Sequence, residues 1–305
     1  MLEVLVAGPL TTVQDLGRPG YAQLGVSRSG ALDPAALRLA NRLVGNADTD
    51  AALELTYGGA ALRTDQPVWC ALTGAPAPLA VDGRPAPYGT AFALLPGRRL
   101  TIGTPTHGIR SYLALSGGIT TPPVLGSRST DTLSALGPTP LTPGTRLPLA
   151  APPTAPILRE LWGRHASDGH IPHSSRKIDA LGVDFVPWCA PGEEIRLRVR
   201  FGPRDDWFAE PAALLRGAWT VGQGDRIGVR LDGPPLVRAV AGELPSEGLV
   251  GGAVQVPGDG RPLVFLADHP TTGGYPVIAV VHPADLGPLA QARPGTRVVF
   301  HGSQR

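Results

Sequence analysis

The segment Leu263-Val-Phe-Leu-Ala-Asp-His-Pro-Thr-Thr-Gly-Gly-Tyr-Pro-Val-Ile-Ala-Val-Val281 shows how this chain is built. Two short apolar runs, Leu263–Leu266 and Val277–Val281, lie on either side of a polar stretch that contains two glycines and two prolines. Each run has the length of a β-strand and is too short for an ordinary helix. The segment therefore predicts two strands joined by a polar connection.

The same pattern continues along most of the chain. The 305 residues include 40 glycines and 34 prolines, which divide the sequence into short apolar or alternating runs. Many short strands with turn residues between them are typical of an all-β barrel or sandwich. Further strands are expected at Leu2–Ala7, Ala52–Tyr57, Val68–Leu72, Ala91–Leu95, Arg110–Leu115, Ile195–Phe201, Ile227–Leu231, Leu236–Val240, Ala253–Val256 and Arg297–His301.

Few segments have the features of a helix. The best marked begins at Asp33, whose side chain can cap free N–H groups, and continues with Pro34, which suits the first helical position. Gly45 can end this helix, so we expect it to include Val44. Shorter helices are expected at Pro211–Arg216 and Ala284–Ala292. The predicted fold class is mainly β with a few short helices.

The middle of the chain differs in composition. Residues 137–157 are too rich in proline for regular strand pairing, and residues 164–177 are polar and contain three histidines. We interpret 137–190 as a connector with loops. The sequence thus predicts two β domains, at about 1–136 and 191–305.

Charge and composition argue against several classes of protein. The formal net charge is only +2, and no arginine-rich stripe with interleaved aromatics is present, so we expect no nucleic-acid partner. No signal-peptide pattern and no apolar run of membrane-spanning length occur, so we expect a cytoplasmic protein without a membrane contact. The histidines lack the spacing of metal ligands, so no metal site is expected. Cys70 and Cys189 each follow a tryptophan and are interpreted as buried free thiols, although a disulfide between them stays open.

A polar segment near the start, Thr11–Gly20, contains candidate functional side chains. Gln14, Asp15 and Arg18 offer an acceptor, an anion and a bidentate donor within what we expect to be one short loop. The alternative is a loop that satisfies its own polar groups, with Asp15 paired to Arg18.

A second polar segment, Gly126–Asp131, has three hydroxyls and Arg128. These groups, Ser129 among them, could bind a carboxylate or phosphate. They could equally cap the following turn, with Asp131 paired to Arg128.

The C-terminal half offers two further candidates. Glu243 and Glu247 lie close together in the sequence, and paired acids can do acid–base work, although surface acids usually do not. The polar connection Asp268–Pro276 carries two hydroxyls, two glycines and a tyrosine. It could receive a small polar group or be only a structural hairpin connection.

Several catalytic signatures are missing. The glycines after residue 16 match neither a phosphate-binding loop nor a dinucleotide fingerprint. No alanine-methionine-lysine-methionine segment is present to carry biotin, and no G-x-S-x-G nucleophile elbow or amidase glycine–serine signature occurs. We therefore expect that the chain alone lacks some of the groups that a complete catalyst needs.

Taken together, the motifs resemble a known family. They are Thr11-Thr-Val-Gln-Asp-Leu-Gly-Arg-Pro-Gly20, Gly30-Ala-Leu-Asp33, Ala40-Asn-Arg-Leu-Val-Gly-Asn46, Leu53-Glu-Leu-Thr56, Tyr112-Leu-Ala-Leu-Ser-Gly-Gly-Ile119, Leu125-Gly-Ser-Arg-Ser-Thr130, Ser246-Glu247, Gln255-Val-Pro257 and Thr271-Thr-Gly-Gly-Tyr-Pro276. The chain resembles the biotin-dependent carboxyltransferase-related family called KipA or the 5-oxoprolinase C subunit, also labelled allophanate hydrolase subunit 2. The likeness spans nearly the whole chain except 137–190.

The resemblance implies two cyclophilin-like β-barrel domains and two 5-oxoprolinase partners, a KipI-like B subunit and an A subunit. It implies an ATP-dependent complex, with Mg accompanying the nucleotide, that opens the small-molecule substrate 5-oxoproline to glutamate without biotin bound covalently to this chain. Relatives fused into urea carboxylase instead move carboxylate from biotin to urea, and others counter a kinase inhibitor. A carboxyltransferase component and a regulatory binder of a KipI-like protein are therefore alternatives.

The resemblance and the residues together assign expected roles. Asp15 and Glu247 are candidates to orient substrate or act as base. The substrate-binding candidates are Gln14, Arg18, Arg128, Ser129, Thr271, Thr272 and Tyr275. We expect their loops to converge on one anion-binding crevice that a partner completes. Which member of the complex binds ATP, and which acid is the base, stay open.

Overall fold

The computed structural model describes residues 1–151, 192–242 and 244–302. The chain forms two compact units, each built from separate stretches of sequence. The first unit comprises Met1–Leu16, Pro34–Thr130 and Gly137–Cys189, and the second comprises Gly17–Asp33, Asp131–Leu136 and Ala190–Arg305. These units do not follow the predicted ranges 1–136 and 191–305, because two segments of the N-terminal range group with the second unit. Most of the predicted connector lies outside the described residues.

Two β-sheets make up the first unit. The six-stranded sheet has the order β11 (Arg146–Leu147), β1 (Leu2–Ala7), β4 (Ala60–Thr64), β9 (Arg99–Ile102), β6 (Leu79–Val81) and β7 (Arg84–Ala86). The five-stranded sheet has the order β2 (Leu10–Gln14), β3 (Ala52–Thr56), β10 (Arg110–Leu115), β5 (Val68–Gly74) and β8 (Phe92–Leu94). All pairings in both sheets are antiparallel.

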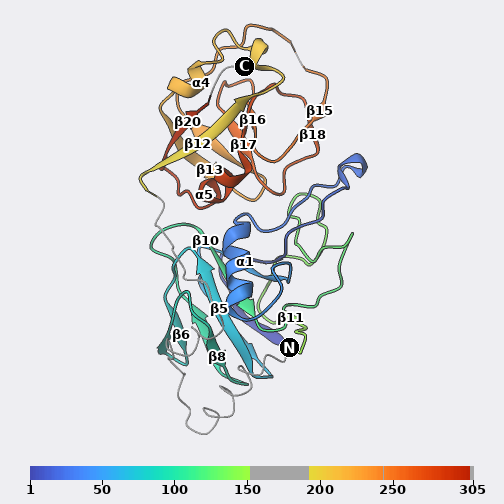
Figure 1. Cartoon of the computed structure of the whole chain (residues 1–305), viewed down its shortest axis with the longest axis vertical. Helices are drawn as coiled ribbons and strands as arrows, with labels where there is room; N and C mark the ends of the chain where they lie inside the picture. Colours follow the sequence, from blue (N-terminus) through green and yellow to red (C-terminus); the bar gives the residue numbers. More distant parts are fainter. Residues whose placement is uncertain (152–191, 243, 303–305) are drawn as a thin grey trace. The chain divides into compact units, whose positions relative to one another are not determined.

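The two faces of the five-stranded sheet differ because side chains alternate along a strand. One face carries leucines such as Leu55 and Leu113 into an apolar core shared with the six-stranded sheet. The other face carries a buried polar row in which Glu54 and Tyr112 are paired in register. Helix α1 (Pro34–Leu43) covers β5 and β10 in Figure 1, and Thr73 donates a hydrogen bond to the carbonyl of Ala36 in this helix (2.6 Å).

A closed barrel forms the second unit. Its strands follow the order β12 (Glu194–Phe201), β19 (Val277–Val281), β16 (Ala253–Gln255), β17 (Leu263–Phe265), β14 (Gly228–Asp232), β13 (Trp219–Gly224) and β20 (Arg297–His301). The parallel pairing of β12 with β20 closes the ring, which is drawn in yellow to red in Figure 1. Along β12 apolar residues alternate with arginines, and the apolar ones are buried.

Short elements complete the second unit. A two-stranded ribbon pairs β15 (Glu247–Gly248) with β18 (Thr272–Gly273). Helix α4 (Ala213–Arg216) precedes β13, and its Leu214 carbonyl accepts a hydrogen bond from the buried Trp219 indole (2.8 Å). Helix α5 (Leu286–Ala290) follows the 3-10 turn Pro283–Asp285, and further 3-10 turns lie at Ala22–Leu24 and Asp205–Trp207.

The predicted fold class, mainly β with a barrel and a few short helices, is confirmed. Most predicted strands are present within about two residues of their expected ends. The prediction at Leu236–Val240 is wrong, because this segment makes only the isolated bridge Phe208↔Arg238. The expectation that Gln14 lies in a loop is also wrong, since Leu10–Gln14 is strand β2. In the described part of the chain, no helix combines the length and apolar character that crossing a membrane requires.

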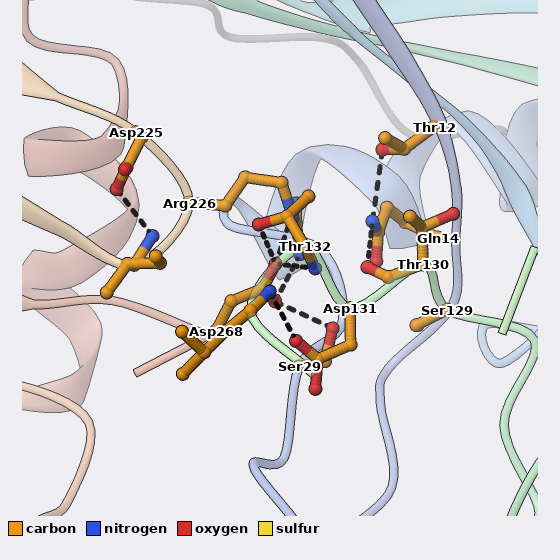
Figure 2. A network of polar contacts seen from close by, with 12 residues as sticks. Thr12, Gln14, Ser29, Ser129, Thr130, Asp131, Thr132, Asp225, Arg226 and Asp268 are labelled. Atoms are coloured by element: carbon orange, nitrogen blue, oxygen red, sulfur yellow. Dashed lines mark hydrogen bonds and ion pairs between the residues drawn. The ribbon is translucent and has the colours of Figure 1, made fainter. Parts of the chain in front are cut away.

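One buried carboxylate joins three segments of the second unit. Asp268 accepts two hydrogen bonds from the Arg226 guanidinium, each 2.9 Å long, and one from the Ser29 hydroxyl (2.7 Å). The backbone N–H and hydroxyl of Thr132 also donate to Asp268, at 2.9 and 2.8 Å, and Arg226 donates further to the Gly30 carbonyl. Figure 2 shows these side chains around Asp268. Gly17–Asp33 and Asp131–Leu136 are thereby tied to the barrel.

The charge of this carboxylate is stabilised despite its burial. Burial by itself raises the pKa of Asp268, but attraction to Arg226 and hydrogen bonds from Arg226, Thr132 and Ser29 outweigh it and hold the pKa below its usual value. A lowered pKa in the folded state means that the ionised group stabilises the fold above the unfolded pKa. This contribution is lost as the pH falls through the folded pKa.

We predict that Asp268→Asn lowers the free energy of unfolding by about 3–5 kcal/mol, since it leaves Arg226 buried without its counter-charge. Urea unfolding at neutral pH measures this. The matched control is Asp232→Asn, which removes a half-exposed ion pair with Arg261 and should cost less than about 1 kcal/mol. Equal stability losses in the two variants would contradict the structural role of Asp268.

Candidate functional site

The predicted site residues fall into two groups, one in each unit. The first unit contains Gln14, Asp15, Arg128 and Ser129. The second contains Arg18, Glu247, Thr271, Thr272 and Tyr275.

In the first unit, Asp15 organises the segment that follows β10. One of its carboxylate oxygens accepts hydrogen bonds from the hydroxyls of Ser127 and Ser129, both 2.6 Å, and the other accepts from the backbone N–H of Arg128 (2.6 Å). The Asp15 N–H donates back to the Ser129 hydroxyl (3.0 Å). Asp15 is 7% exposed, and both serines are fully buried. This aspartate therefore holds residues 127–129 against the end of β2.

Gln14 lies beside this loop at the end of β2. Its amide nitrogen donates to the Thr130 carbonyl (2.9 Å) and to the Thr12 hydroxyl (3.0 Å), as Figure 2 shows. The amide oxygen is buried and has no hydrogen-bond partner among the described residues. Gln14 thus connects β2 to the polar loop and keeps one acceptor available inside the first unit.

Arg128 is half buried, and its position suits anion binding. Its Nε donates to the Thr121 carbonyl (2.8 Å), which fixes the guanidinium plane. Within the described residues Arg128 has no carboxylate at ion-pair distance. The alternative that Asp131 pairs with Arg128 is not what the structure shows, because Asp131 accepts instead from Ser27 and from the backbone of Leu133 and Ser134.

Arg18, in the second unit, is held in the interior. Its side chain is fully buried, with Nη1 4.0 Å from a carboxylate oxygen of Asp131. The Arg18 backbone N–H donates to the Arg28 carbonyl (2.7 Å). The structure thus pairs Arg18 with Asp131, whereas the sequence suggested Asp15. In this setting Arg18 fixes the segment Gly17–Asp33.

Glu247 lies on the ribbon of β15 and β18, opposite Gly273. Its carboxylate accepts two hydrogen bonds from the Arg204 guanidinium, through Nε (3.1 Å) and Nη2. Hydrogen bonding from Arg204 is the main cause that holds the pKa of Glu247 below its usual range. Burial raises this pKa by a smaller amount than the hydrogen bonding lowers it, and attraction to the Arg204 guanidinium lowers it further. Glu243, the other acid of the predicted pair, lies outside the described residues.

The segment Thr271–Tyr275 runs along the same end of the barrel. Thr272 is exposed and Thr271 is half buried, while the Tyr275 side chain is 49% exposed. The Tyr275 carbonyl accepts a hydrogen bond from the buried Gln255 amide (2.9 Å). A β-carbon at Gly273 would lie 2.8 Å from that amide nitrogen, so a larger residue there would require the Gln255 side chain to shift.

Arg238 was not identified from the sequence, yet it contacts a predicted site residue. Its guanidinium carbon lies 5.8 Å from the centre of the Tyr275 ring. The residue falls in a segment that the sequence presented as an ordinary strand, and a lone arginine in a strand gives no signal of a site. Only the fold brings residues 238 and 275 together.

The described part of the chain contains a buried thiol and no cluster of potential metal ligands. No group of three or more His, Cys, Asp or Glu side chains is placed there to hold a metal ion. Cys70 is a buried free thiol, as predicted, and burial raises the pKa of its thiol well above the usual value. Cys189 and the three connector histidines His165, His170 and His173 lie outside the described residues.

Comparison with known proteins identifies the family. The model of the carboxyltransferase domain, subdomains A and B, matches residues 24–302. This chain belongs to the carboxyltransferase domain family. The C subunit of Escherichia coli 5-oxoprolinase is 40% identical over 304 residues, which cover 98% of this chain and 90% of that protein. The resemblance that the motifs indicated is thus confirmed.

Two other proteins that are similar to this chain are longer. Urea amidolyase of Saccharomyces cerevisiae is 33% identical, and the match covers 98% of this chain but 16% of that protein. The protein in the crystal structure of TTHA0988 is 35% identical in sequence to this chain, and the two structures superpose with a TM-score of 0.82. The match covers 98% of this chain and 56% of the chain in that crystal structure. This chain therefore spans about half the length of that solved structure.

We predict that Asp15→Asn lowers the free energy of unfolding by about 1–3 kcal/mol, because it weakens hydrogen bonds from three buried donors to a charged acceptor. Amide hydrogen exchange at Ser127–Ser129 should become faster. Asp48→Asn is the control, since Asp48 forms a half-exposed ion pair with Arg42 in the same unit. Unchanged exchange at residues 127–129 would contradict this role of Asp15.

We predict that Arg204→Gln raises the pKa of Glu247 towards its ordinary value, because the main cause of the lowering is removed. Carbon-13 NMR titration of the Glu247 carboxyl group measures this shift. If ionised Glu247 is required for turnover, the acid limb of the pH–rate profile moves to higher pH in the same variant. Arg261→Gln, whose partner is Asp232, should leave the Glu247 titration unchanged. An unmoved titration in Arg204→Gln would refute the assignment of the ion pair.

Proposed function

We propose that this chain is the C subunit of an ATP-dependent 5-oxoprolinase complex that converts 5-oxoproline to glutamate. The observation that carries the proposal is the extent of the match to the C subunit of Escherichia coli 5-oxoprolinase, which covers 98% of one chain and 90% of the other at 40% identity. The match to urea amidolyase covers only 16% of that protein. The identity to the 5-oxoprolinase C subunit is also higher than the identity to urea amidolyase, 40% against 33%.

The chemistry explains why such a complex needs ATP. A lactam carbonyl is a poor electrophile at neutral pH. Transfer of the γ-phosphoryl group to its oxygen gives an activated intermediate, which water attacks at the carbonyl carbon. The C–N bond then breaks and leaves a γ-glutamyl phosphate, which a second water hydrolyses to glutamate and phosphate. The sum is 5-oxoproline, ATP and two waters giving glutamate, ADP and phosphate. Such steps depend on fixed donors that stabilise developing negative charge.

The first unit offers donors of this kind. The Arg128 guanidinium is oriented by the Thr121 carbonyl and has no carboxylate partner among the described residues. Ser127, Ser129 and Asp15 hold its backbone in place. We assign Arg128 to substrate or phosphoryl oxygen binding, and Gln14 to positioning next to it.

The remaining parts of the catalyst belong to the complex. We propose a KipI-like B subunit and an A subunit as partners, with ATP and Mg bound at the level of the assembled complex. This chain carries no biotin-attachment motif, so the proposed reaction uses no biotin bound to it.

A second function merits a test because the matching family is a carboxyltransferase and urea amidolyase is a member. In that case the chain would transfer a carboxyl group from biotin held on another protein to a urea-type acceptor. The polar loops described above would then bind the carboxylate in transit.

We predict that the chain mixed with its A and B partners releases glutamate only when 5-oxoproline and ATP are both present. Coupled assays for glutamate and ADP measure this. Turnover of urea that requires bicarbonate and biotin would support the second function. Tight binding of the B partner with no turnover of either substrate would favour a regulatory role and overturn the proposal.

Arg128→Ala tests the site in the same assay. We expect kcat/KM to fall by about 10- to 100-fold, the effect of losing a charge-assisted hydrogen bond, while the complex still assembles. Arg63→Ala is the control, because Arg63 is a half-exposed arginine of the first unit paired with Glu3. Full activity of Arg128→Ala would remove Arg128 from the site.

A further inference from the structure

Arg238 is fixed in place by the backbone around it. It forms a bridge with Phe208, and the hydrogen bonds on either side run from the Ala209 N–H to the Val237 carbonyl (3.0 Å) and from the Ala239 N–H to the Trp207 carbonyl (2.8 Å). The side chain is thus projected from a restrained backbone. Little conformational entropy would be lost if it bound a ligand.

The guanidinium of Arg238 is also held from two sides. Its Nη2 donates to the Val256 carbonyl (2.9 Å), and its carbon atom lies 5.8 Å from the centre of the Tyr275 ring, within the range of a cation–π contact. Its Nε is buried and has no hydrogen-bond partner among the described residues. The protein thus satisfies a donor on Nη2 but not the donor on Nε.

Arg238 differs from several arginines of the second unit that are paired with carboxylates. Arg204 pairs with Glu247, Arg226 with Asp268 and Arg230 with Asp259. No carboxylate of the described residues lies at ion-pair distance from Arg238. A half-buried cation without a counter-charge is energetically unfavourable, and an anionic ligand would relieve this cost.

The surroundings of Arg238 limit the kind of anion. Glu247 neutralises Arg204, whereas Arg238, which contacts Tyr275 in the segment after β18, has no carboxylate partner among the described residues. One guanidinium matches a singly charged carboxylate, while a nucleotide polyphosphate would need several cations. The Tyr275 side chain, whose ring lies 5.8 Å from the guanidinium carbon of Arg238, is half exposed, so a small molecule can approach this pair from solvent.

We propose that Arg238 and Tyr275 form a carboxylate-binding subsite at this end of the barrel. Arg238 donates hydrogen bonds to the carboxylate, and the Tyr275 ring holds the guanidinium plane in position. The identity of the ligand rests on the proposed function, under which the carboxylate is that of 5-oxoproline. The simpler alternative is that Arg238 only ties its segment to the Val256 carbonyl.

Binding of radiolabelled 5-oxoproline to the assembled complex without ATP, measured by equilibrium dialysis, tests the subsite. We expect Arg238→Met to weaken binding by about 10- to 100-fold, which corresponds to the loss of one charge-assisted contact. Arg238→Lys should recover only part of the affinity, because lysine keeps the charge but lacks the planar fork. In turnover assays, Arg238→Met should raise KM for 5-oxoproline more than it lowers kcat.

A substrate analogue separates carboxylate binding from structural support. 2-Pyrrolidinone has the lactam ring but no carboxylate, so wild-type complex should bind it weakly and Arg238→Met should change that binding by less than about twofold. A merely structural role would weaken both ligands equally. Arg261→Met, a half-exposed arginine of the same barrel paired with Asp232, is the control and should bind 5-oxoproline normally.

The possible results keep the two proposals apart. If Arg238→Met binds 5-oxoproline as wild type does, or if the complex does not bind 5-oxoproline at all, the subsite is refuted. If binding depends on Arg238 but no glutamate forms with ATP, the proposed function fails while the subsite stands. If turnover occurs and is insensitive to Arg238, the function stands and the subsite fails.

Discussion

The second unit depends on the contact between Asp268 and Arg226. The two side chains are almost fully buried, and the carboxylate receives further hydrogen bonds from Ser29 and Thr132. Apolar packing has no directional preference and could not select a register for the segments 17–33 and 131–136. The Asp268 carboxylate, which accepts hydrogen bonds from five donors, can select the register, because a buried donor that does not reach it loses its hydrogen bonds to water without replacement.

The same principle operates in the first unit, with a different consequence for function. Asp15 gathers two hydroxyls and a backbone N–H from residues 127–129, so its acceptor capacity serves the fold. Asp131 is similarly occupied by backbone and hydroxyl donors in the second unit. Acids that the sequence presented as chemical candidates therefore act largely as structural acceptors. Arg128 and Arg238 are left without carboxylate partners among the described residues.

The sequence was informative where local chemistry determines structure. Apolar runs bounded by glycine and proline predicted strands such as Leu2–Ala7 and Arg297–His301 with their correct ends, because a strand buries alternate or all side chains in a short segment. Strand β2 was missed because its polar residues are buried beside other polar residues. A strand with this composition has the same sequence pattern as a polar loop. Strand β13 was missed because its two glycines resemble a turn.

Contacts between distant residues were less predictable. Polar motifs indicated which segments carry functional groups, but they did not show which partner each group has. Arg18 pairs with Asp131, which is 113 residues away in the sequence, and Arg226 pairs with Asp268, which is 42 residues away. Nothing in local sequence distinguishes these arginines from Arg128, which has no such partner among the described residues. A structural arginine is buried and paired with a carboxylate, whereas an arginine available to a ligand has no such partner. Only the fold shows which arginines are buried and which are paired.

This distribution of charge bears on how the chain can act. Glu247, the remaining acid of the predicted site, is paired with Arg204, and a lowered pKa makes its carboxylate a weak base. Asp15 and Glu247 are engaged by donors, whereas Arg128 and Arg238 have no carboxylate partner among the described residues, which suits these two arginines to holding anions in place. The proposed division of labour agrees with these contacts, because it assigns the nucleotide site and the proton transfer to partner proteins.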